Sequence, residues 1–557
     1  MLAGTLHETL DEAAAKSPDV LTTFPGDPAA LSLLDLAASS ALMAAGLWAA
    51  GVRAGDRVGI LCRNEPHFVQ ALFAVSRLGA AACPLPLPAT IGSGAEQHTS
   101  RLRRIAATAH IRHVVVTERL GALAAHLGTA LPGVRLLPAG GLLAGAVGRP
   151  VLPGVDPAAV AVVQFTSGTT QQPRGVRLSH CQVLAGLDAI GAGLDIGPGD
   201  RGSIWLPLYH DMGLFGLLSG LLVGAPTTLW SPMSFVRAPG RWLRAFAEER
   251  ATICPSPNFG YDYLLGAVGP DEAATLDLSH WRVALNGSET VAPDSVTAFL
   301  DRFAPAGFRP EAMLAAYGLA EATLAVTLPP LDRGPVFDRV DAERLVREGV
   351  VVPAGSGGRV RSLTALGRAV PGMALRITDP ATGAVLPDER VGELRIRGAS
   401  VTSGYLTDDP SAAGPAQATR PFAGDGWLRT GDLGYLRRGE LFLTGRLKEM
   451  IVVRGVNYHP EDVEGVVRAM PGIYRRMCVA FPGEGESMVL AAETPLTEPD
   501  DRGRLAADIA TEVRRATGLS GLRVHLLPPR SIPRTTSGKL QRLATRELVD
   551  AAPPEAT

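Results

Sequence analysis

Runs of residues typical of helices and of strands alternate along this chain. Residues 35–50 have the pattern of a helix closed by Gly51, 56–62 that of a strand, and 66–79 that of a second helix. The same order returns over residues 102–127. Strands that alternate with helices predict a largely parallel sheet covered on both faces, so we expect an α/β fold. Ligands of such sheets bind at the carboxyl ends of the strands, so functional residues are expected just after the apolar runs.

The apolar run at residues 162–165 ends in a loop of hydroxyl-bearing and small residues that leads to a cation. Such a loop suits the oxygens of a polyphosphate, because small residues allow close approach while hydroxyls and backbone N–H groups donate hydrogen bonds. It is not a Walker loop, since the order Gly-x4-Gly-Lys-Ser/Thr is absent. An ordinary surface turn has the same composition, so the loop alone leaves both interpretations open. The candidate phosphate-binding residues are Thr166, Ser167, Gly168, Thr169, Thr170 and Arg174.

Two later apolar runs, residues 281–285 and 313–317, also lead into small polar residues. The first is followed by Asn286, Gly287 and Ser288, and the second ends at Tyr317 before a short loop. One such loop is common in any protein. Three of them, each at the end of a predicted strand, indicate a shared binding crevice.

Composition gives no electrostatic reason to expect nucleic acid or an anionic membrane as a partner, because the formal net charge is only -2. The 5 cysteines are scattered and form no CxxC pair, which favours buried thiols in a reducing compartment over a disulfide framework or a zinc site. The N-terminus lacks the pattern of a secretory signal. The apolar segment 31–50 contains Asp35 and two serines, so it predicts a core helix and not a membrane span. We therefore expect a cytoplasmic protein without stable membrane insertion.

The second half of the chain has a different organisation. The charged stretch 331–358 reads as an insertion on the main domain. Short β-like runs that follow it predict a small antiparallel, barrel-like subdomain. From residue 446, strands and helices resume on a smaller scale, as expected for a separate α+β module. The predicted domains are therefore 1–445 and 446–557.

Five motifs in a fixed order resemble the adenylate-forming superfamily of acyl-CoA synthetases, peptide-synthetase adenylation domains and luciferases. They are the phosphate loop, Tyr-Gly-Leu-Ala-Glu at 317–321, Thr-Gly-Asp at 430–432, a hinge at 445–449 and a loop ending at Lys539. The resemblance covers nearly the whole chain. It implies a large N-terminal domain and a mobile C-terminal domain that carries Lys539 as the catalytic lysine.

Within that superfamily the chain is most similar to the fatty acyl-AMP ligases, through residues 205–214, 257–262, 281–287 and 454–464. This resemblance implies that a medium- or long-chain carboxylic acid reacts with MgATP to give acyl-adenylate and pyrophosphate. The acyl group then passes to an acyl carrier protein. The insertion lies where those ligases carry one, and there it is associated with not proceeding to coenzyme A. An acyl-CoA synthetase and a catalytically silent nucleotide-binding relative remain the alternatives.

The chemistry of this reaction needs cations more than a base, because a carboxylate is already ionised near pH 7. Its obstacle is the approach of an anion to a polyanion, so catalysis consists of positioning and charge stabilisation. The resemblance assigns the bridging cation to Lys539, whose alternative is a solvated loop lysine. It assigns the Mg²⁺ ligand to Glu321, whose alternative is a carboxylate at a helix N-terminus.

The nucleotide contacts follow from the same resemblance. Asp432 is expected to accept hydrogen bonds from the ribose hydroxyls, and Arg446 to contact ribose or phosphate oxygens. An ordinary turn and a surface arginine are the respective alternatives. The residues expected to frame the adenine or to lie beside it are Asn286, Gly287, Ser288, Ala316, Tyr317 and Gly318.

His210 is expected near the carboxylate of the substrate, where it could orient the acid; a purely structural histidine is the alternative. Asp211 beside it would then orient the imidazole. The chain departs from the family pattern at Arg174, where a lysine is usual, and at Lys448, where many relatives have aspartate. Arg174 keeps the positive charge of the loop, so we expect activity to survive.

Overall fold

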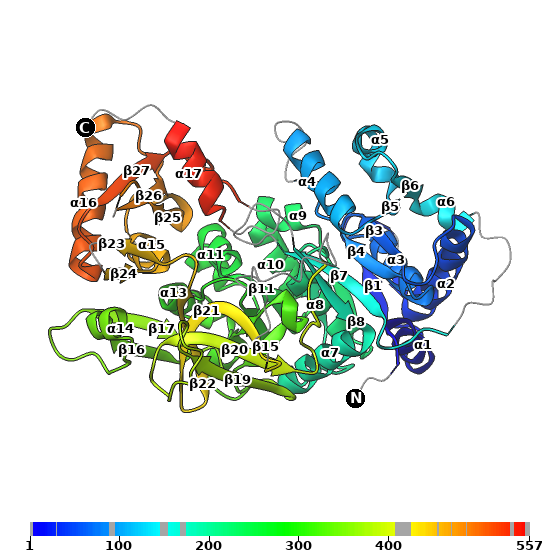
Figure 1. Ribbon diagram of the computed structural model, residues 1–557, viewed down its shortest axis with the longest axis horizontal. Coiled ribbons are helices and arrows are strands. Elements are labelled where there is room, and N and C mark those ends of the chain that lie inside the picture. Colours follow the sequence, from blue (N-terminus) through cyan, green and yellow to red (C-terminus); the bar gives the residue numbers. More distant parts are fainter. Residues whose placement is uncertain are drawn as a thin grey trace.

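The computed structural model describes residues 4–28, 30–88, 95–144, 154–166, 174–406, 425–453, 456–468, 470–485, 487–534 and 540–551 (Figure 1). The structure has the mixed α/β architecture that the alternating pattern predicts. Two largely parallel sheets with helices on their faces form its larger part, and a smaller part follows residue 450.

The first sheet has six strands in the order β6-β5-β3-β4-β7-β8. All neighbours pair in parallel except β7 and β8, which are antiparallel. The strands are β3 (Arg57–Leu61), β4 (Ala81–Pro84), β5 (His113–Val116), β6 (Arg135–Pro138), β7 (Val160–Thr166) and β8 (Arg174–Ser179). The helices predicted near residues 35–50 and 66–79 are α2 (Leu33–Ala49) and α3 (Pro66–Arg77). Both begin and end within two residues of the predicted bounds.

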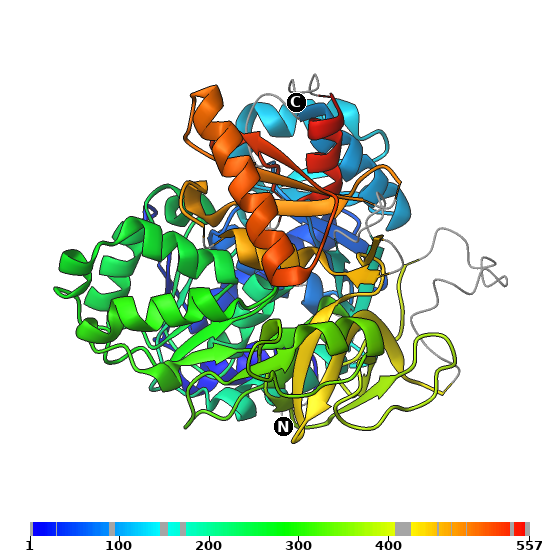
Figure 2. The ribbon, with the colours of Figure 1, turned by 90° about the vertical axis from the view of Figure 1, so that its left-hand side faces the viewer.

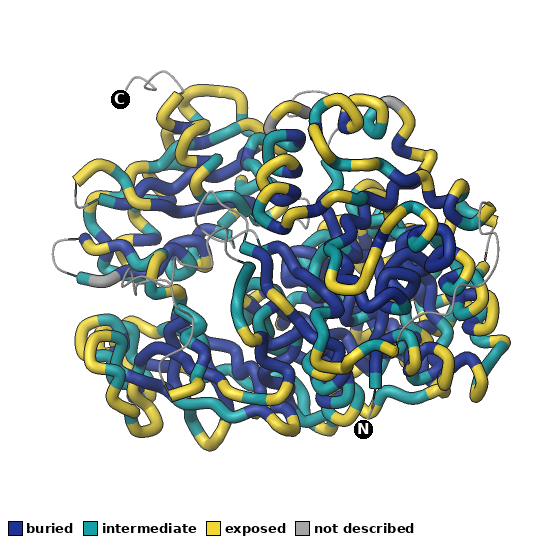
Figure 3. Tube along the Cα trace, turned by 45° about the vertical axis from the view of Figure 1, so that its right-hand side comes forward, coloured by how far each residue is buried: buried dark blue, intermediate teal, exposed yellow. Residues whose placement is uncertain are grey.

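The second sheet has seven strands in the order β13-β12-β11-β9-β10-β1-β2, with only β1 and β2 antiparallel. Its strands are β1 (Leu21–Thr23), β2 (Ala30–Ser32), β9 (Gly202–Ile204), β10 (Thr227–Leu229), β11 (Ile253–Ser256), β12 (Val283–Asn286) and β13 (Met313–Ala315). The helices nearest the site are α7 (His180–Leu194), α8 (Asp211–Leu221), α11 (Asn258–Ala267) and α13 (Pro293–Phe303). Most residues of these strands are buried, and Figure 3 shows the buried chain gathered in the interior of this larger part.

The predicted antiparallel subdomain is also present. Its four strands pair in chain order and are β19 (Met373–Thr378), β20 (Gly392–Gly398), β21 (Leu428–Arg437) and β22 (Glu440–Arg446). The charged stretch before it forms β16 (Phe337–Asp341) and α14 (Ala342–Glu348), which lead to β17 (Val360–Thr364). Tyr435 and Phe442 of the subdomain stack with ring centroids 5.0 Å apart and share a small core with this stretch.

The C-terminal part has an apolar core made only of its own residues, between Ile451 and Leu526. Helix α16 (Pro499–Thr517) lies against strand β27 (Leu522–Leu527) on its outer side (Figure 2). Its other elements are β23 (Ile451–Val453), β24 (Val456–Tyr458), α15 (Pro460–Arg468), β25 (Cys478–Pro482), β26 (Met488–Glu493) and α17 (Arg542–Ala551). The exact division into domains 1–445 and 446–557 stays a prediction.

The remaining expectations concern the burial of the cysteine side chains and the presence of a membrane-spanning helix. Four of the cysteines are buried as expected, but Cys181 is exposed because it lies on the outer side of the first turn of α7. Among the described residues, no helix is both long and apolar enough to cross a bilayer.

Candidate functional site

The carboxyl ends of three neighbouring strands lie side by side in one row. Ser256, Asn286 and Ala315 are paired across β11, β12 and β13, and each lies at the end of its strand. The backbone N–H of Ala316 donates to the carbonyl oxygen of Asn286 at 2.8 Å, which continues the row beyond the strands. A Cβ atom on Gly287 would lie 2.8 Å from the carbonyl oxygen of Ala316, so only glycine fits there without a shift. The structure thus brings together the predicted residues Asn286, Gly287 and Ala316.

The side chain of Asn286, in the middle of this row, is buried and has one unused hydrogen-bond acceptor. Its Nδ2 donates to Oδ1 of Asn258 at 3.3 Å, but its own Oδ1 has no hydrogen-bond partner among the described residues. A buried acceptor without a partner is costly, and a ligand donor would satisfy it. Ser288, two residues on, has a positive φ of 70°, which is uncommon for a residue with a side chain.

Three predicted residues, Tyr317, Asp432 and Arg446, form one hydrogen-bonded group. The hydroxyl of Tyr317 donates to Oδ2 of Asp432 at 2.5 Å, and Nε of Arg446 donates to Oδ1 at 3.0 Å. Asp432 and Arg446 face each other because β21 and β22 are antiparallel and pair at these positions. The carboxylate of Asp432 raises the pKa of Arg446, while burial raises the pKa of Tyr317 well above its usual value. Tyr317 is therefore a protonated donor at neutral pH.

The side chain of Tyr405 lies between Glu321 and Arg174 and contacts both. Oε1 of Glu321 accepts a hydrogen bond of 2.7 Å from the hydroxyl of Tyr405, and the guanidinium of Arg174 lies 5.6 Å from the centre of the Tyr405 ring. Burial raises the pKa of Glu321, and the Tyr405 hydrogen bond opposes that shift. Gly318, three residues before Glu321, leaves no room for a side chain, since a Cβ would lie 2.0 Å from the carbonyl oxygen of Leu324.

The phosphate loop is described only at its two ends. Thr166 ends β7 and pairs with Arg174, which begins β8. Ser167, Gly168, Thr169 and Thr170 lie outside the described residues. The position of Thr166 and Arg174 at the carboxyl end of β7 agrees with the expected placement of this loop.

His210 lies at the N-terminus of α8, where the backbone N–H of Met212 donates to Oδ1 of Asp211 at 2.7 Å. Nδ1 of His210 lies 2.6 Å from the same Oδ1 of Asp211, which is within reach to orient the imidazole. The preceding carbonyl, that of Tyr209, accepts a hydrogen bond of 2.6 Å from Nε2 of Gln164. Because Gln164 belongs to β7, this bond ties the His210 turn to the strand that leads into the phosphate loop.

Lys539 itself lies outside the described residues, but the chain on either side of it is described. Arg534 and Leu540 pair as an isolated β-bridge. The guanidinium of Arg534 lies 5.2 Å from the ring centre of Phe259 and 5.7 Å from that of Tyr263, both on α11. Helix α11 begins two residues after Ser256, so the base of the predicted lysine loop rests beside the row of strand ends.

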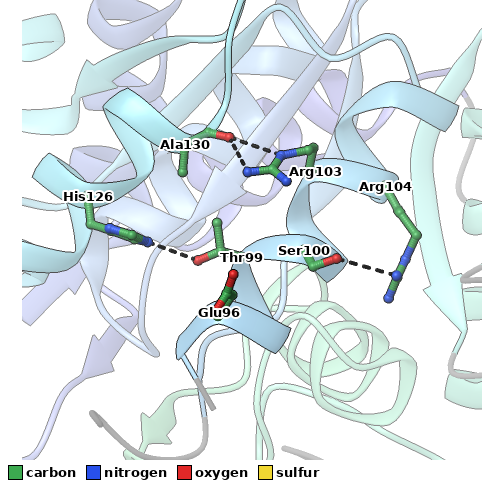
Figure 4. A pocket seen from close by; sticks show the side chains of 7 residues that line it. All are labelled: Glu96, Thr99, Ser100, Arg103, Arg104, His126 and Ala130. Atoms are coloured by element: carbon green, nitrogen blue, oxygen red, sulfur yellow. Dashed lines mark hydrogen bonds between the residues drawn. The ribbon is translucent and has the colours of Figure 1, made fainter. Parts of the chain in front are cut away.

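A large surface hollow of about 640 Å³ lies elsewhere, between α4 (Ala95–Thr108) and α5 (Gly121–Ala130) (Figure 4). Its polar groups bond to one another: Arg103 donates to the carbonyl oxygen of Ala130, and Thr99 contacts His126. No predicted site residue lines it. Size alone therefore does not identify the functional site.

The comparisons with known proteins agree with this geometry. The family model described as AMP-binding enzyme matches residues 10–406.

The chain belongs to the AMP-binding enzyme family.

Three relatives cover most of this AMP-binding enzyme. A Caulobacter vibrioides protein provisionally named an acyl-CoA synthetase is 35% identical over 97% of this chain and 94% of its own. The 4-hydroxyphenylalkanoate adenylyltransferase of Mycobacterium tuberculosis is 34% identical over 88% of this chain and 82% of its own. A medium-chain-fatty-acid–[acyl-carrier-protein] ligase of Teredinibacter turnerae is 33% identical over 71% of this chain and 64% of its own.

Among solved structures, a chain from a study of the fatty acyl-adenylate ligases of E. coli and L. pneumophila superposes with a TM-score of 0.89. It is 31% identical, and the match covers 98% of both chains. The resemblance to the adenylate-forming superfamily is therefore confirmed. This AMP-binding enzyme is an acid ligase that uses ATP.

In this AMP-binding enzyme, two predicted site residues have hydrogen-bond partners that the sequence pattern did not reveal. Tyr405 bonds to Glu321 across 84 residues, and Asn258 bonds to Asn286 across 28. Neither residue stands out locally, because a lone tyrosine or asparagine near a turn is common. Asn258 lies in a stretch that resembles the fatty acyl-AMP ligases, which was the one available signal.

A Mg²⁺ ion would fit beside Glu321 if substrate phosphates supply most of its ligands. Within the described residues, no group of three or more histidine, cysteine or acidic side chains could hold a metal ion by itself. Mg²⁺ bound with a nucleotide needs only one or two carboxylates from the protein, and a buried carboxylate such as that of Glu321 gains from a nearby cation.

Proposed function

We propose that this enzyme joins a fatty acid to AMP and then transfers the acyl group to an acyl carrier protein. One observation carries the proposal: in the row of strand ends, Ser256 and Asn286 each follow directly after a residue, Pro255 and Leu285, that lines an apolar cavity. A nucleotide needs the polar row, and an alkyl chain needs the cavity. The fatty-acid ligases among its relatives and structural neighbours support the same assignment.

The polar groups suit the parts of ATP in order. Asp432, held by Tyr317 and Arg446, has lone pairs left for the ribose hydroxyls. The free Oδ1 of Asn286 suits an amino group of the adenine, with Gly287, Ser288, Ala316 and Gly318 forming the surface around it. Thr166 and Arg174, with residues 167–170, would bind the phosphates.

In the first reaction a carboxylate oxygen forms a bond to the α-phosphorus while the bond to pyrophosphate breaks. His210 would orient the acid, and Lys539 would supply the positive charge between the carboxylate and the α-phosphate. Glu321 would hold Mg²⁺, which when bound neutralises charge on the phosphates. No proton moves in this step, because the acid is already ionised at pH 7.

In the second reaction a thiol sulfur bonds to the acyl carbon, the bond to AMP breaks, and the thiol proton passes to solvent. A carrier protein or coenzyme A could supply the thiol. The Teredinibacter turnerae relative favours the carrier protein, and the Caulobacter vibrioides relative favours coenzyme A. The contact between the predicted insertion and the C-terminal part supports the first alternative: helix α14 of the insertion packs against strand β24 of the C-terminal part.

Thioester formation with two acceptors tests this choice. Purified enzyme, ATP, Mg²⁺ and decanoate are incubated with either coenzyme A or a holo acyl carrier protein, and thioester is measured by mass spectrometry. We expect pyrophosphate in both mixtures but efficient thioester formation only on the carrier protein. Efficient formation of decanoyl-CoA would instead establish the acyl-CoA synthetase alternative.

A further inference from the structure

The apolar cavity has a defined top and bottom relative to the strand ends. Leu285 and Pro255 line its upper part, one residue below Asn286 and Ser256. Val283 and Ile253 line its lower part, two residues further down the same strands. Strands rise about 3.3 Å per residue, so the bottom lies roughly 10 Å below the row of strand ends.

Helix α8 gives an independent measure of the depth of the same cavity. A Cβ on Gly216 would lie 3.2 Å from the ring of Pro255, so Gly216 is level with the upper part. A Cβ on Gly220 would lie 3.7 Å from Oγ1 of Thr227, whose partner in β9 is Gly202 at the bottom. The step of four residues from Gly216 to Gly220 rises about 6 Å along the helix, in agreement with the strands.

These lengths limit the alkyl chain. With C–C bonds of about 1.5 Å, an extended chain advances roughly 1.3 Å per carbon, so about eight carbons reach from the strand ends to the bottom. Counting from His210 at the N-terminus of α8 to Gly220 gives about 15 Å, or at most about twelve carbons. The cavity volume of about 40 Å³ holds roughly three water-sized groups, which matches the last few carbons of such a chain.

The bottom of the cavity contains polar groups that are already fully bonded. The carboxylate of Asp200 accepts two hydrogen bonds of 2.6 Å from Arg282, one of 2.8 Å from Thr252 and one of 3.0 Å from the N–H of Gly197. A carboxylate has about four acceptor sites, so none is left.

The remaining hydroxyls of the cavity are used in the same way. Oγ of Ser219 donates to the carbonyl oxygen of Phe215 at 2.7 Å, and Oγ1 of Thr227 donates to that of Ala225 at 3.3 Å. A hydroxyl or phenol at the end of the substrate would lose its hydrogen bonds to water on entry, and the cavity does not replace them well.

We propose that the cavity binds the end of the acyl chain and selects unbranched, unsubstituted acids of about eight to twelve carbons. Gly220 sets the lower limit of the cavity, and Leu194, whose carbonyl oxygen accepts from Arg282, closes the same end. This inference rests on the proposed function, since it names the class of acid that the ligase activates.

The test measures kcat/KM for pyrophosphate release with hexanoate, octanoate, decanoate, dodecanoate, hexadecanoate and a hydroxyphenylalkanoate. We expect a maximum between octanoate and dodecanoate and values at least about tenfold lower for hexadecanoate and the aryl acid. Gly220→Val should move the maximum about two carbons shorter, because a valine side chain takes the space of the last carbons. Leu194→Ala should move it towards longer acids.

Gly191→Val is the matched control, since Gly191 lies in helix α7 and a Cβ there meets no atom within 4 Å. It should leave the chain-length profile unchanged. Gly220 has only ordinary contacts around its Cβ position, so Gly220→Val is expected to fold even if Leu194→Ala does not. The inference is overturned if hexadecanoate or the aryl acid is the best substrate, or if the maximum does not move in Gly220→Val. In either case the proposed function stands. Absence of pyrophosphate release with every acid would overturn both.

Discussion

Asp432 is the residue on which the proposed nucleotide contacts depend, because it accepts hydrogen bonds from both Tyr317 and Arg446. Asp432→Asn removes the negative charge that holds the arginine. Hydrogen bonds to charged groups contribute about 1.5–3 kcal/mol, so we expect kcat/KM for ATP to fall about 10- to 100-fold.

Tyr317→Phe is the milder companion variant. It removes one hydrogen bond but leaves the ion pair of Asp432 with Arg446 intact, so a loss of about tenfold or less is expected. Steady-state kinetics at varied ATP measures both variants. Equal ATP kinetics in wild type and Asp432→Asn would show that Asp432 does not contact the nucleotide.

The hydroxyl of Tyr405 donates a hydrogen bond of 2.7 Å to the carboxylate of Glu321. Burial raises the pKa of Glu321, and the hydrogen bond from Tyr405 lowers it. In Tyr405→Phe that pKa should therefore rise further. If ionised Glu321 is needed to hold Mg²⁺, activity is lost as pH falls through this pKa, so the acidic limb of the kcat/KM profile should move to higher pH.

The profile is measured between about pH 5 and 8 at saturating Mg²⁺. The variant should lose most activity relative to wild type at the acidic end and least at the alkaline end. A uniform loss at every pH would argue that Tyr405 only shapes the site and does not tune Glu321.

At the scale of elements, helix α1 (Leu6–Lys16) is attached to α7 through a buried histidine. The backbone N–H of Leu6 donates to Nδ1 of His180 at 3.2 Å, and burial lowers the pKa of His180 from its ordinary 6.5 to about 4. The unfolded chain therefore binds one more proton than the folded chain between about pH 4 and 6.5, so stability falls as pH falls through this window.

The expected loss of unfolding free energy over that window is about 3 kcal/mol. Urea unfolding at several pH values measures it. His180→Gln keeps an acceptor for the N–H of Leu6 but cannot be protonated in this range, so its stability should depend less on pH. If His180→Gln and wild type lose stability in parallel, other groups cause the acid sensitivity.

Helices with regularly spaced apolar residues could be predicted from the sequence, because that spacing is a property of neighbouring residues. The bounds of α2 and α3 follow from apolar spacing and from closing glycines. The order of strands could not be predicted, since β1 near the N-terminus joins β10 in the second sheet only through contacts distant in sequence. Asp432 and Arg446 stood out by motif, whereas Tyr405 did not, because its role arises only where the fold brings it to Glu321.

At the scale of the molecule, the C-terminal part is tied to the larger part by an ion pair. Arg361 of β17 lies 2.5 Å from Asp462 of α15, and both side chains are only 12% exposed. Burial raises the pKa of Asp462 to about 6, and Arg361 opposes this shift. Removing the arginine leaves a buried carboxyl group without its cation.

Arg361→Ala should therefore lower the stability of this contact by about 3 kcal/mol, the cost of breaking a buried pair. Hydrogen exchange in α15 should become faster. Arg347→Ala is the control, because Arg347 pairs with Glu343 on the exposed face of α14 and should cost less than about 1 kcal/mol. Similar exchange rates in the two variants would contradict a role for Arg361 in holding the parts together.

Lys539 is proposed to supply the positive charge with which this enzyme forms an acyl-adenylate. Exchange of labelled pyrophosphate into ATP tests it directly, because exchange requires reversible formation of the adenylate. We expect exchange that depends on decanoate and Mg²⁺ and that falls at least about 100-fold in Lys539→Ala. Exchange without any carboxylic acid would contradict acyl-adenylate formation, and an unchanged rate in Lys539→Ala would contradict the role of Lys539.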